Sequence, residues 1–276
     1  MKVKASSKAR DSLTLCLDVG NTQIYAGLFD SQGQIALRFR QSSGKSISAD
    51  EYGVSLKATL RENGFDPERV TRMAMCSVVP DRVYMIRRAC QKYFGIDPLV
   101  LQAGVKTGLK IEYHNPLEVG SDRIANAVGA AERYPGRNCI IVDLGTATTL
   151  EVVTADKRYL GGAIAPGLRL SMEVLEQNTA RLPAVEIAAI NHACGRSTVE
   201  SIQSGLYFGH IGMMRELITR IRKERFATTE DPVLVIGTGG FAHMFSEAGL
   251  FDAIEPDLVL EGLFLTLRRN DASINA

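Results

Sequence analysis

The sequence lacks several features that would point to particular partners or locations. Its 32 Lys and Arg residues nearly balance 31 Asp and Glu, and the formal net charge of +1 gives no field that would attract nucleic acid or a membrane surface. No apolar run approaches the roughly 20 residues that span a bilayer. The five cysteines form no C-x-x-C pair and have no histidine spacing typical of zinc. These absences favour small-molecule chemistry in a reducing cytoplasm.

The amino-terminal segment, residues 1–12, is basic and contains several serines. The apolar run that follows it is too short for a secretory signal and is interrupted by Asp18. We expect a flexible tail here, with an organellar transit peptide as the alternative.

Two similar glycine-bearing loops, one in each half of the chain, are the main positive signal. Each follows an apolar run that ends in an aspartate: Asp18-Val19-Gly20-Asn21-Thr22 in the first half and residues 143–149 (DLGTATT) in the second. Both regions are predicted to form strand, loop, strand, turn and strand. We interpret them as an internal duplication, with an amino-terminal domain over 13–136 and a carboxyl-terminal domain over 137–276.

The remaining segments alternate between helical and strand patterns. This order predicts a mixed α/β fold. Helices are predicted over 48–62, 81–93, 121–133, 166–175, 197–208, 211–223 and 258–268, and further strands over 70–79, 98–102 and 233–236.

The loops have the composition of a phosphate site. Glycine lets backbone N–H groups approach an anion closely, and Thr22, Thr146, Thr148 and Thr149 add hydroxyl donors. The aspartates that precede the loops, Asp18 and Asp143, need cations beside a polyphosphate, and Mg²⁺ held largely through water is the usual solution. Tight hairpin turns with capping aspartates are the alternative. A third glycine-rich segment, residues 237–240 (GTGG), would supply the place for an adenosine.

Three such loops in this order resemble the actin, hexokinase and Hsp70 superfamily, and five sequence blocks together resemble type III pantothenate kinases. The resemblance implies two duplicated ribonuclease-H-like (actin-like ATPase) domains with mixed sheets flanked by helices, and ATP held in a cleft between them. It also implies phosphorylation of the 4′-hydroxyl of pantothenate by ATP, the first step of coenzyme A biosynthesis. The blocks are 17–22 (LDVGNT), 120–126 (GSDRIAN), 142–149 (VDLGTATT), 161–167 (GGAIAPG) and 201–205 (SIQSG).

Asp122 is the candidate catalytic residue. At the start of the helix predicted over 121–133, the positive end of the dipole and the free N–H groups should favour its charged carboxylate. Such a group can accept the proton of an alcohol that attacks phosphorus. From the residues alone, a helix cap with Arg123 as a solvated partner is the alternative. The resemblance implies that Asp122 is the general base, and Arg123 could bind the carboxylate of an acidic substrate.

The resemblance also assigns the other site residues. It implies that Asp143 holds potassium or ammonium, which leaves Asp18 to hold Mg²⁺ through water. A homodimer is implied, with Thr198 at the subunit interface, although this chain has Ser197 where the family usually has Asn. His114 is interpreted as a loop residue. The proposed ATP contacts are Asp18, Val19, Gly20, Asn21, Thr22, Gln23, Ile24, Tyr25, Thr146 and Gly239, and the proposed pantothenate contacts are Tyr113, Gly120, Ser121, Asp122, Arg123 and Thr198.

Two alternative functions remain open at this point. One is another small-molecule kinase of the same superfamily, acting on a sugar; the short chain and the G-S-D-R block directly before a helix argue against it. The other is a nucleotide-binding regulator without catalysis. The sequence contains no DNA-binding motif in support of that alternative. The three aspartates that a kinase would need, Asp18, Asp122 and Asp143, are all present.

Overall fold

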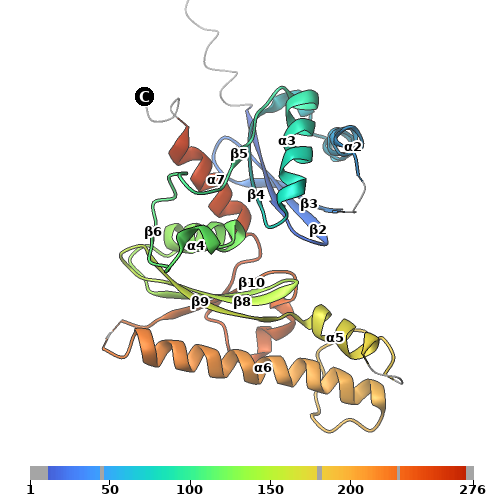
Figure 1. Ribbon diagram of the computed structural model, residues 1–276, viewed down its shortest axis with the longest axis vertical. Helices are drawn as coiled ribbons and strands as arrows, with labels where there is room; N and C mark the ends of the chain where they lie inside the picture. Colours follow the sequence, from blue (N-terminus) through green and yellow to red (C-terminus); the bar gives the residue numbers. More distant parts are fainter. Residues whose placement is uncertain (1–11, 44–46, 179–181, 229–230, 272–276) are drawn as a thin grey trace, which may run out of the picture. The chain divides into compact units, whose positions relative to one another are not determined.

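The structure, a computed structural model, describes residues 12–43, 47–178, 182–228 and 231–271. The chain divides into two compact units, each assembled from separated stretches of sequence (Figure 1). Unit 1 comprises Met1–Gly108, Asn115–Gly129 and Val259–Ala276, and unit 2 comprises Leu109–His114 and Ala130–Leu258. Apart from Ser12, the predicted tail lies outside the described residues.

A five-stranded mixed sheet forms the centre of unit 1. Its strands are β1 (Leu13–Val19), β2 (Gln23–Phe29), β3 (Ile35–Ser42), β4 (Val70–Ser77) and β5 (Leu99–Val100). They lie in the order β3-β2-β1-β4-β5. The first three strands form an antiparallel meander, and β4 and β5 extend the sheet in parallel. The strand, loop, strand, turn and strand predicted for this region are therefore confirmed.

The sheet of unit 1 is covered by helices on both faces. Alternate apolar residues of β1, such as Leu15 and Leu17, form a buried cluster with residues of α2 (Ala49–Glu62) and α3 (Pro80–Phe94). On the other face, Phe29 of β2 stacks on Phe264 of α7 (Leu258–Asn270), with ring centroids 4.6 Å apart. The last helix of the chain thus completes the core of unit 1.

Local sequence signals set the helix ends in unit 1. Ser48 and Glu51 form a capping box at the start of α2, in which each side chain satisfies a backbone N–H that the helix leaves unpaired. At the carboxyl-terminal end of α3, Gly95 adopts a left-handed conformation with φ 69°, which costs glycine little. Short 3₁₀ turns lie at Pro67–Arg69 and Pro116–Glu118.

Unit 2 contains a six-stranded mixed sheet. Its strands are β6 (Lys110–Ile111), β7 (Cys139–Leu144), β8 (Ala147–Val153), β9 (Arg158–Pro166), β10 (Leu234–Thr238) and β11 (Ala253–Ile254). They lie in the order β11-β10-β7-β8-β9-β6. β7, β8 and β9 form an antiparallel meander like that of unit 1, and β10 runs parallel to β7. The second predicted meander is therefore confirmed, as is the mixed α/β class with two sheets flanked by helices.

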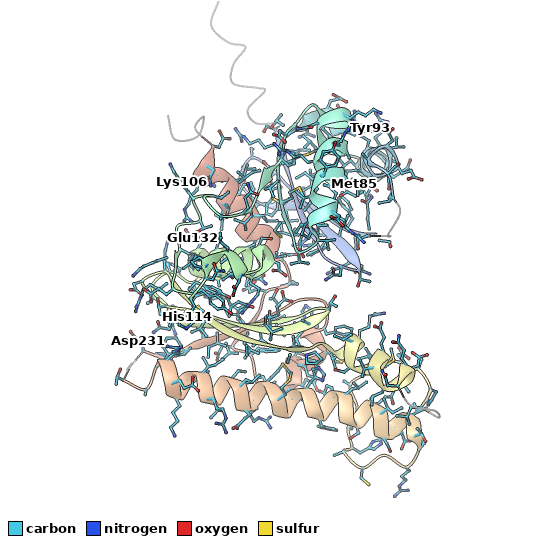
Figure 2. All side chains as sticks on the ribbon, in the orientation of Figure 1. Met85, Tyr93, Lys106, His114, Glu132 and Asp231 are labelled. Atoms are coloured by element: carbon cyan, nitrogen blue, oxygen red, sulfur yellow. The ribbon has the colours of Figure 1, made fainter. Side chains whose placement is uncertain are left out.

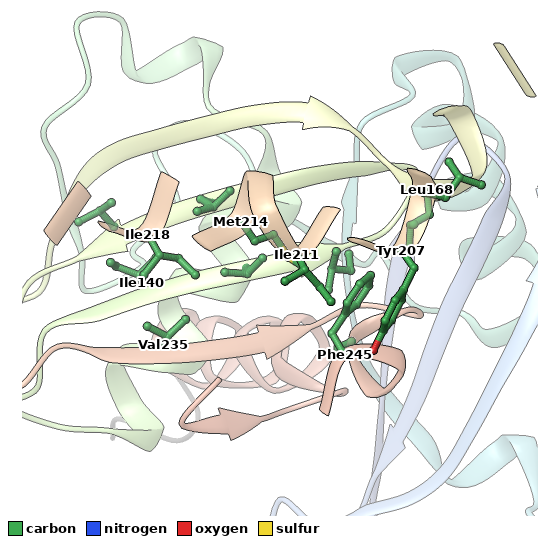
Figure 3. Close-up of a cluster of buried hydrophobic side chains, with 14 of the residues drawn as sticks. Ile140, Leu168, Tyr207, Ile211, Met214, Ile218, Val235 and Phe245 are labelled. Atoms are coloured by element: carbon green, nitrogen blue, oxygen red, sulfur yellow. The ribbon is translucent and has the colours of Figure 1, made fainter. Parts of the chain in front are cut away.

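The core of unit 2 lies between its sheet and the long helix α6 (Thr198–Arg225). Figure 3 shows Ile140 of β7 and Val235 of β10 in one cluster with Ile211, Met214 and Ile218 of that helix. Apolar residues at this helical spacing bury one face of α6 against the sheet. This core also includes residues of α5 (Leu168–Gln177) and of the 3₁₀ segment Ala242–Ala248.

The prediction of two helices over 197–208 and 211–223 is wrong, because α6 is continuous across this stretch. Gly209 lies between the two predicted helices and has room for a side chain. His210 is buried, and its Nδ1 lies 2.8 Å from the Leu206 carbonyl oxygen, one turn back. Packing of the apolar face against the sheet therefore outweighs the low helix propensity of glycine.

None of the helices that the structure describes is both long enough and apolar enough to cross a bilayer.

Candidate functional site

In unit 1, polar residues gather where β1 and β4 end. The parallel pairing of these strands places Asp18 opposite Cys76, and the Cys76 thiol donates a hydrogen bond to Asp18 Oδ1 at 3.3 Å. Burial raises the pKa of the Cys76 thiol well above its usual value, and the Asp18 and Asp122 carboxylates reinforce the shift. The thiol is therefore protonated at neutral pH and can serve as a donor.

The first glycine-bearing loop joins β1 to β2 through a tight turn. The Gly20 N–H donates to the Gln23 carbonyl at 3.0 Å. Ser43 anchors the loop, because its hydroxyl donates to the Asn21 carbonyl at 2.9 Å and its N–H to the Thr22 carbonyl at 3.1 Å. The side chains of residues 21–23 are exposed. A fixed backbone with exposed polar side chains suits a loop that receives a ligand.

The start of α4 (Ser121–Arg133) is bonded to the end of β4. Ser121 Oγ accepts from the Ser77 N–H and donates to the Ser77 carbonyl oxygen, both at 3.1 Å. The next residue, Asp122, accepts from the Arg123 N–H through Oδ1 at 2.8 Å. This bond occupies one carboxylate oxygen, but it comes from the next residue, whereas a helix cap accepts from an N–H two or three residues further on.

Burial dominates the electrostatics of Asp122. It raises the pKa of this carboxyl above its usual value, although the Arg123 N–H and guanidinium oppose the shift. The expectation that the helix start would stabilise the charged form is therefore wrong in its net direction, because desolvation outweighs the local donors. Arg123 is also buried, at 7% exposed, so it is not the solvated partner of the alternative interpretation. A carboxylate with a raised pKa is a stronger base.

In unit 2, the loop after β7 lies beside the third glycine-rich segment. Parallel pairing places Asp143 opposite Thr238. The following residue, Gly239, has φ +84°, and a Cβ added there would collide with Asp143 Oδ1 and lie 2.7 Å from the Leu144 nitrogen. Only a residue without a side chain can approach the carboxylate this closely. Asp143 and the glycine-rich segment 237–240 therefore lie side by side in the structure, a proximity that the sequence alone did not show.

Gly167 supports the same loop from the end of β9. Its N–H donates to the Thr146 carbonyl at 3.2 Å, and an added Cβ would collide with that oxygen. The Thr146 side chain is exposed. The loop therefore presents a hydroxyl to solvent from a fixed backbone.

Tyr113 and His114 belong to Leu109–His114, a short stretch in the first half of the sequence that is part of unit 2. The Tyr113 ring lies over Gly161 of β9, where an added Cβ would come within 3.2 Å of it. Its centroid is 6.4 Å from that of Tyr159. His114, labelled in Figure 2, is exposed in a loop, as expected.

Thr198 is the first residue of α6 and is exposed. Ser197 caps the helix by accepting from the Glu200 N–H at 3.2 Å; serine and asparagine are comparable caps, so this departure from the family pattern keeps the local structure. A cavity of about 840 Å³ opens beside this helix start. Its lining includes Ser171, Arg196, Thr198, Ser201 and His210.

Sequence reasoning missed two residues that shape these sites, Ser43 and Cys76, and gave Gly167 only as the last residue of the block 161–167. Cys76 lies within an apolar strand, and its spacing from the other cysteines suggested no metal or redox role. The sequence carried no signal for its contact with Asp18, because the partner is 58 residues away. Across the described residues, no group of three or more His, Cys, Asp or Glu side chains is arranged to hold a metal ion.

Comparisons with known proteins identify relatives of the chain. A family model described as type III pantothenate kinase matches residues 14–220. A type III pantothenate kinase from Legionella pneumophila (strain Corby) is 54% identical over 260 residues, which cover 94% of this chain and 100% of the relative. One from Elusimicrobium minutum is 42% identical over 258 residues, covering 94% and 99% of the two chains. Among solved structures, a protein assigned as a 2-dehydro-3-deoxygalactonokinase from Sinorhizobium meliloti superposes with a TM-score of 0.56 at 13% identity, over 94% and 97% of the chains.

Proposed function

We propose residue roles for this chain, which belongs to the type III pantothenate kinase family and phosphorylates pantothenate in coenzyme A biosynthesis. The observation that carries the proposal is the buried start of α4. There, Asp122 has a raised pKa and lies in the same unit as Asp18 and its glycine loop. A base and a phosphate loop are the two parts that phosphoryl transfer to an alcohol requires.

Asp122 acts as the general base. Its carboxylate takes the proton of the pantothenate 4′-hydroxyl as that oxygen forms a bond to the γ-phosphorus of ATP. The bond from this phosphorus to the bridging oxygen breaks, and ADP leaves with the electron pair. The transition state is loose, so the proton moves late and a carboxylate is basic enough.

The glycine-bearing loops carry the proposed ATP contacts. In unit 1, Gly20 and its neighbours offer backbone N–H groups and exposed side chains to the phosphates. In unit 2, the exposed Thr146 hydroxyl is available to a phosphate oxygen, and Gly239 borders the place for adenosine. The unit 1 contacts are Asp18, Val19, Gly20, Asn21, Thr22, Gln23, Ile24 and Tyr25.

The aspartates near the ends of β1 and β7 are each assigned a cation. Asp18 would hold Mg²⁺ through water, an arrangement that fits a single carboxylate beside exposed polar groups, because Mg²⁺ keeps several waters and takes phosphate ligands. When bound, the ion neutralises charge on the phosphates. Asp143 would hold K⁺ or NH₄⁺. A single carboxylate matches the charge of a singly charged ion, and an added Cβ at Gly239 would collide with Asp143 Oδ1, so the glycine-rich segment lies beside the proposed site.

The proposed pantothenate contacts are residues around the start of α4, Tyr113 and Thr198. Arg123 can pair with the substrate carboxylate, Tyr113 offers an aromatic surface over Gly161, and Thr198 contributes its exposed hydroxyl. The remaining proposed contacts are Gly120, Ser121 and Asp122.

A homodimer accounts best for the surface near Thr198. Leu170, Val174 and Val199 are 39%, 49% and 43% exposed there, and apolar side chains clustered around a site favour an interface. Other α6 residues that suggested dimerisation, Ile211 and Met214, are buried in the core of unit 2 instead. A cytoplasmic location is supported by the five cysteines, all of which are free thiols.

The proposal is tested by a coupled assay of ADP release with Mg²⁺ and K⁺ present. Pantothenate, hexoses and N-acetylhexosamines serve as acceptors. We expect turnover with pantothenate alone. Turnover with a sugar alone, or ATP binding without turnover on any acceptor, would contradict it.

A further inference from the structure

The last two residues of β4 contact both elements that carry the proposed catalytic carboxylates of unit 1. Cys76 donates its thiol hydrogen bond to Asp18 Oδ1 at 3.3 Å. Its neighbour Ser77 exchanges two hydrogen bonds of 3.1 Å with the Ser121 hydroxyl, through the backbone N–H and the carbonyl oxygen. Ser121 directly precedes Asp122. The end of β4 is therefore hydrogen-bonded both to Asp18 and to the residue that precedes Asp122.

The place of this strand end in the fold is firmly set. β4 pairs in parallel with β1 through the last residues of both strands, from Leu13 opposite Val70 to Val19 opposite Ser77. The Cys76 side chain is completely buried. A backbone held by a sheet ladder and a buried side chain has little freedom, so groups bonded to it are held at a fixed spacing.

We propose that the end of β4 sets the spacing between Asp18 and Asp122, with Cys76 and Ser121 as positioning residues for the phosphoryl transfer. Two carboxylates close to one thiol repel each other, and a mobile pair would move apart. The Cys76 bond fixes the first carboxylate, and the Ser121 bonds fix the helix start that carries the second. This inference rests on the roles proposed above for the two aspartates.

The hydrogen bonds also limit what Cys76 and Ser121 can do directly. Ser121 has one hydroxyl proton, which it donates to the Ser77 carbonyl, so it has no proton left to donate to pantothenate. Cys76 has no exposed surface through which to contact a substrate. In this positioning role both side chains act through the aspartates that they hold, and the pantothenate contact proposed for Ser121 is left to its backbone.

The first experiment replaces the thiol and measures kcat and both KM values. Cys76→Ala removes the donor and should raise KM for ATP about 10-fold, the usual effect of losing one hydrogen bond to a charged group. KM for pantothenate should stay within about 2-fold of wild type, since Asp122 keeps its own support. Cys76→Ser keeps a donor and should restore most of the ATP affinity. Cys90→Ala is the matched control, because this thiol is equally buried on α3.

The second experiment tests the other contact without relying on the first variant. Ser121→Ala should lower kcat about 10- to 100-fold, because a small displacement of the base is costly, and leave KM for ATP unchanged. Thermal melting checks that each variant is folded. If Cys76→Ala does not fold, Cys76→Ser together with Ser121→Ala still gives the predicted separation of KM and kcat effects.

The outcomes separate this inference from the function. Wild-type protein that does not phosphorylate pantothenate would refute the function, and the inference with it. An active wild type overturns the inference alone if Cys76→Ala resembles Cys90→Ala in every kinetic constant, if Cys76→Ser is as impaired as Cys76→Ala, or if Ser121→Ala keeps full kcat. The inference stands if serine rescues position 76 and alanine at position 121 lowers kcat selectively.

Discussion

The carboxylate of Asp122 folds back over Gly120, where an added Cβ would lie 2.5 Å from Oδ1. The glycine therefore provides the space that this carboxylate occupies, and the Arg123 N–H holds it there at 2.8 Å.

Gly120→Ala should displace the Asp122 side chain without unfolding unit 1. Because real Cβ atoms do not approach an oxygen this closely, the carboxylate must rotate away from its present position. We expect kcat to fall about 10- to 100-fold, with ATP binding retained. Steady-state kinetics and calorimetric titration with a nucleotide analogue measure the two effects. A variant with unchanged kcat would show that the carboxylate position is not critical.

The pH dependence of kcat/KM should report the raised pKa of Asp122. A general base must be deprotonated, so activity should fall as the pH drops through this value. Because burial raises the pKa of the free-enzyme carboxyl, the acidic limb should lie above the range of an ordinary aspartate. The profile should be recorded with buffers of constant ionic strength. An acidic limb at or below the ordinary aspartate pKa would contradict the assignment.

Gly239→Ala should weaken ATP binding and lower stability. The residue has φ +84° and no room beside Asp143, so alanine adds both backbone strain, about 1 kcal/mol or more, and a collision with the carboxylate. Gly249→Ala is the matched control, since its φ is +64° and nothing lies within 4 Å of an added Cβ. Denaturant unfolding and nucleotide titration should separate the two variants. Equal losses in both would indicate backbone strain alone.

Replacing K⁺ by Na⁺ should depress the turnover of wild-type protein. The proposed site at Asp143 is assigned to K⁺ or NH₄⁺, and Na⁺ is smaller and more strongly hydrated, so it should be a poor replacement. Asp143→Asn should be slow in both salts. The measurement is kcat at fixed ionic strength in KCl, NH₄Cl and NaCl. Equal rates in all three salts would remove the monovalent ion from the account.

Local features of the sequence were sufficient to predict both meanders and most helices. In each meander, apolar runs of strand length end at an aspartate and a glycine turn, and these signals act over a few residues. The same reasoning failed where it divided residues 197–223 into two helices, because the stability of α6 comes from packing against a distant sheet. It could not anticipate that residues 259–270 of α7 belong to unit 1, since nothing in a helix pattern tells which sheet the helix covers.

The candidate site, too, could be predicted from the sequence only in part. The aspartates and glycines could be chosen from motifs, and the family resemblance supplied their roles. The direction of the Asp122 pKa shift could not be predicted, because it depends on burial by residues far apart in the sequence. Cys76 was missed for the same reason: its chemistry arises from the register between β1 and β4.

The most direct test of the central claim is Asp122→Asn, assayed for both turnover on pantothenate and binding of a nucleotide analogue. The amide keeps the shape of the side chain and removes the base. We predict that analogue affinity stays within about 2-fold of wild type, while kcat falls by about 10²- to 10⁴-fold. A variant that binds the analogue normally and keeps most of its turnover would contradict the assignment of Asp122 as the general base.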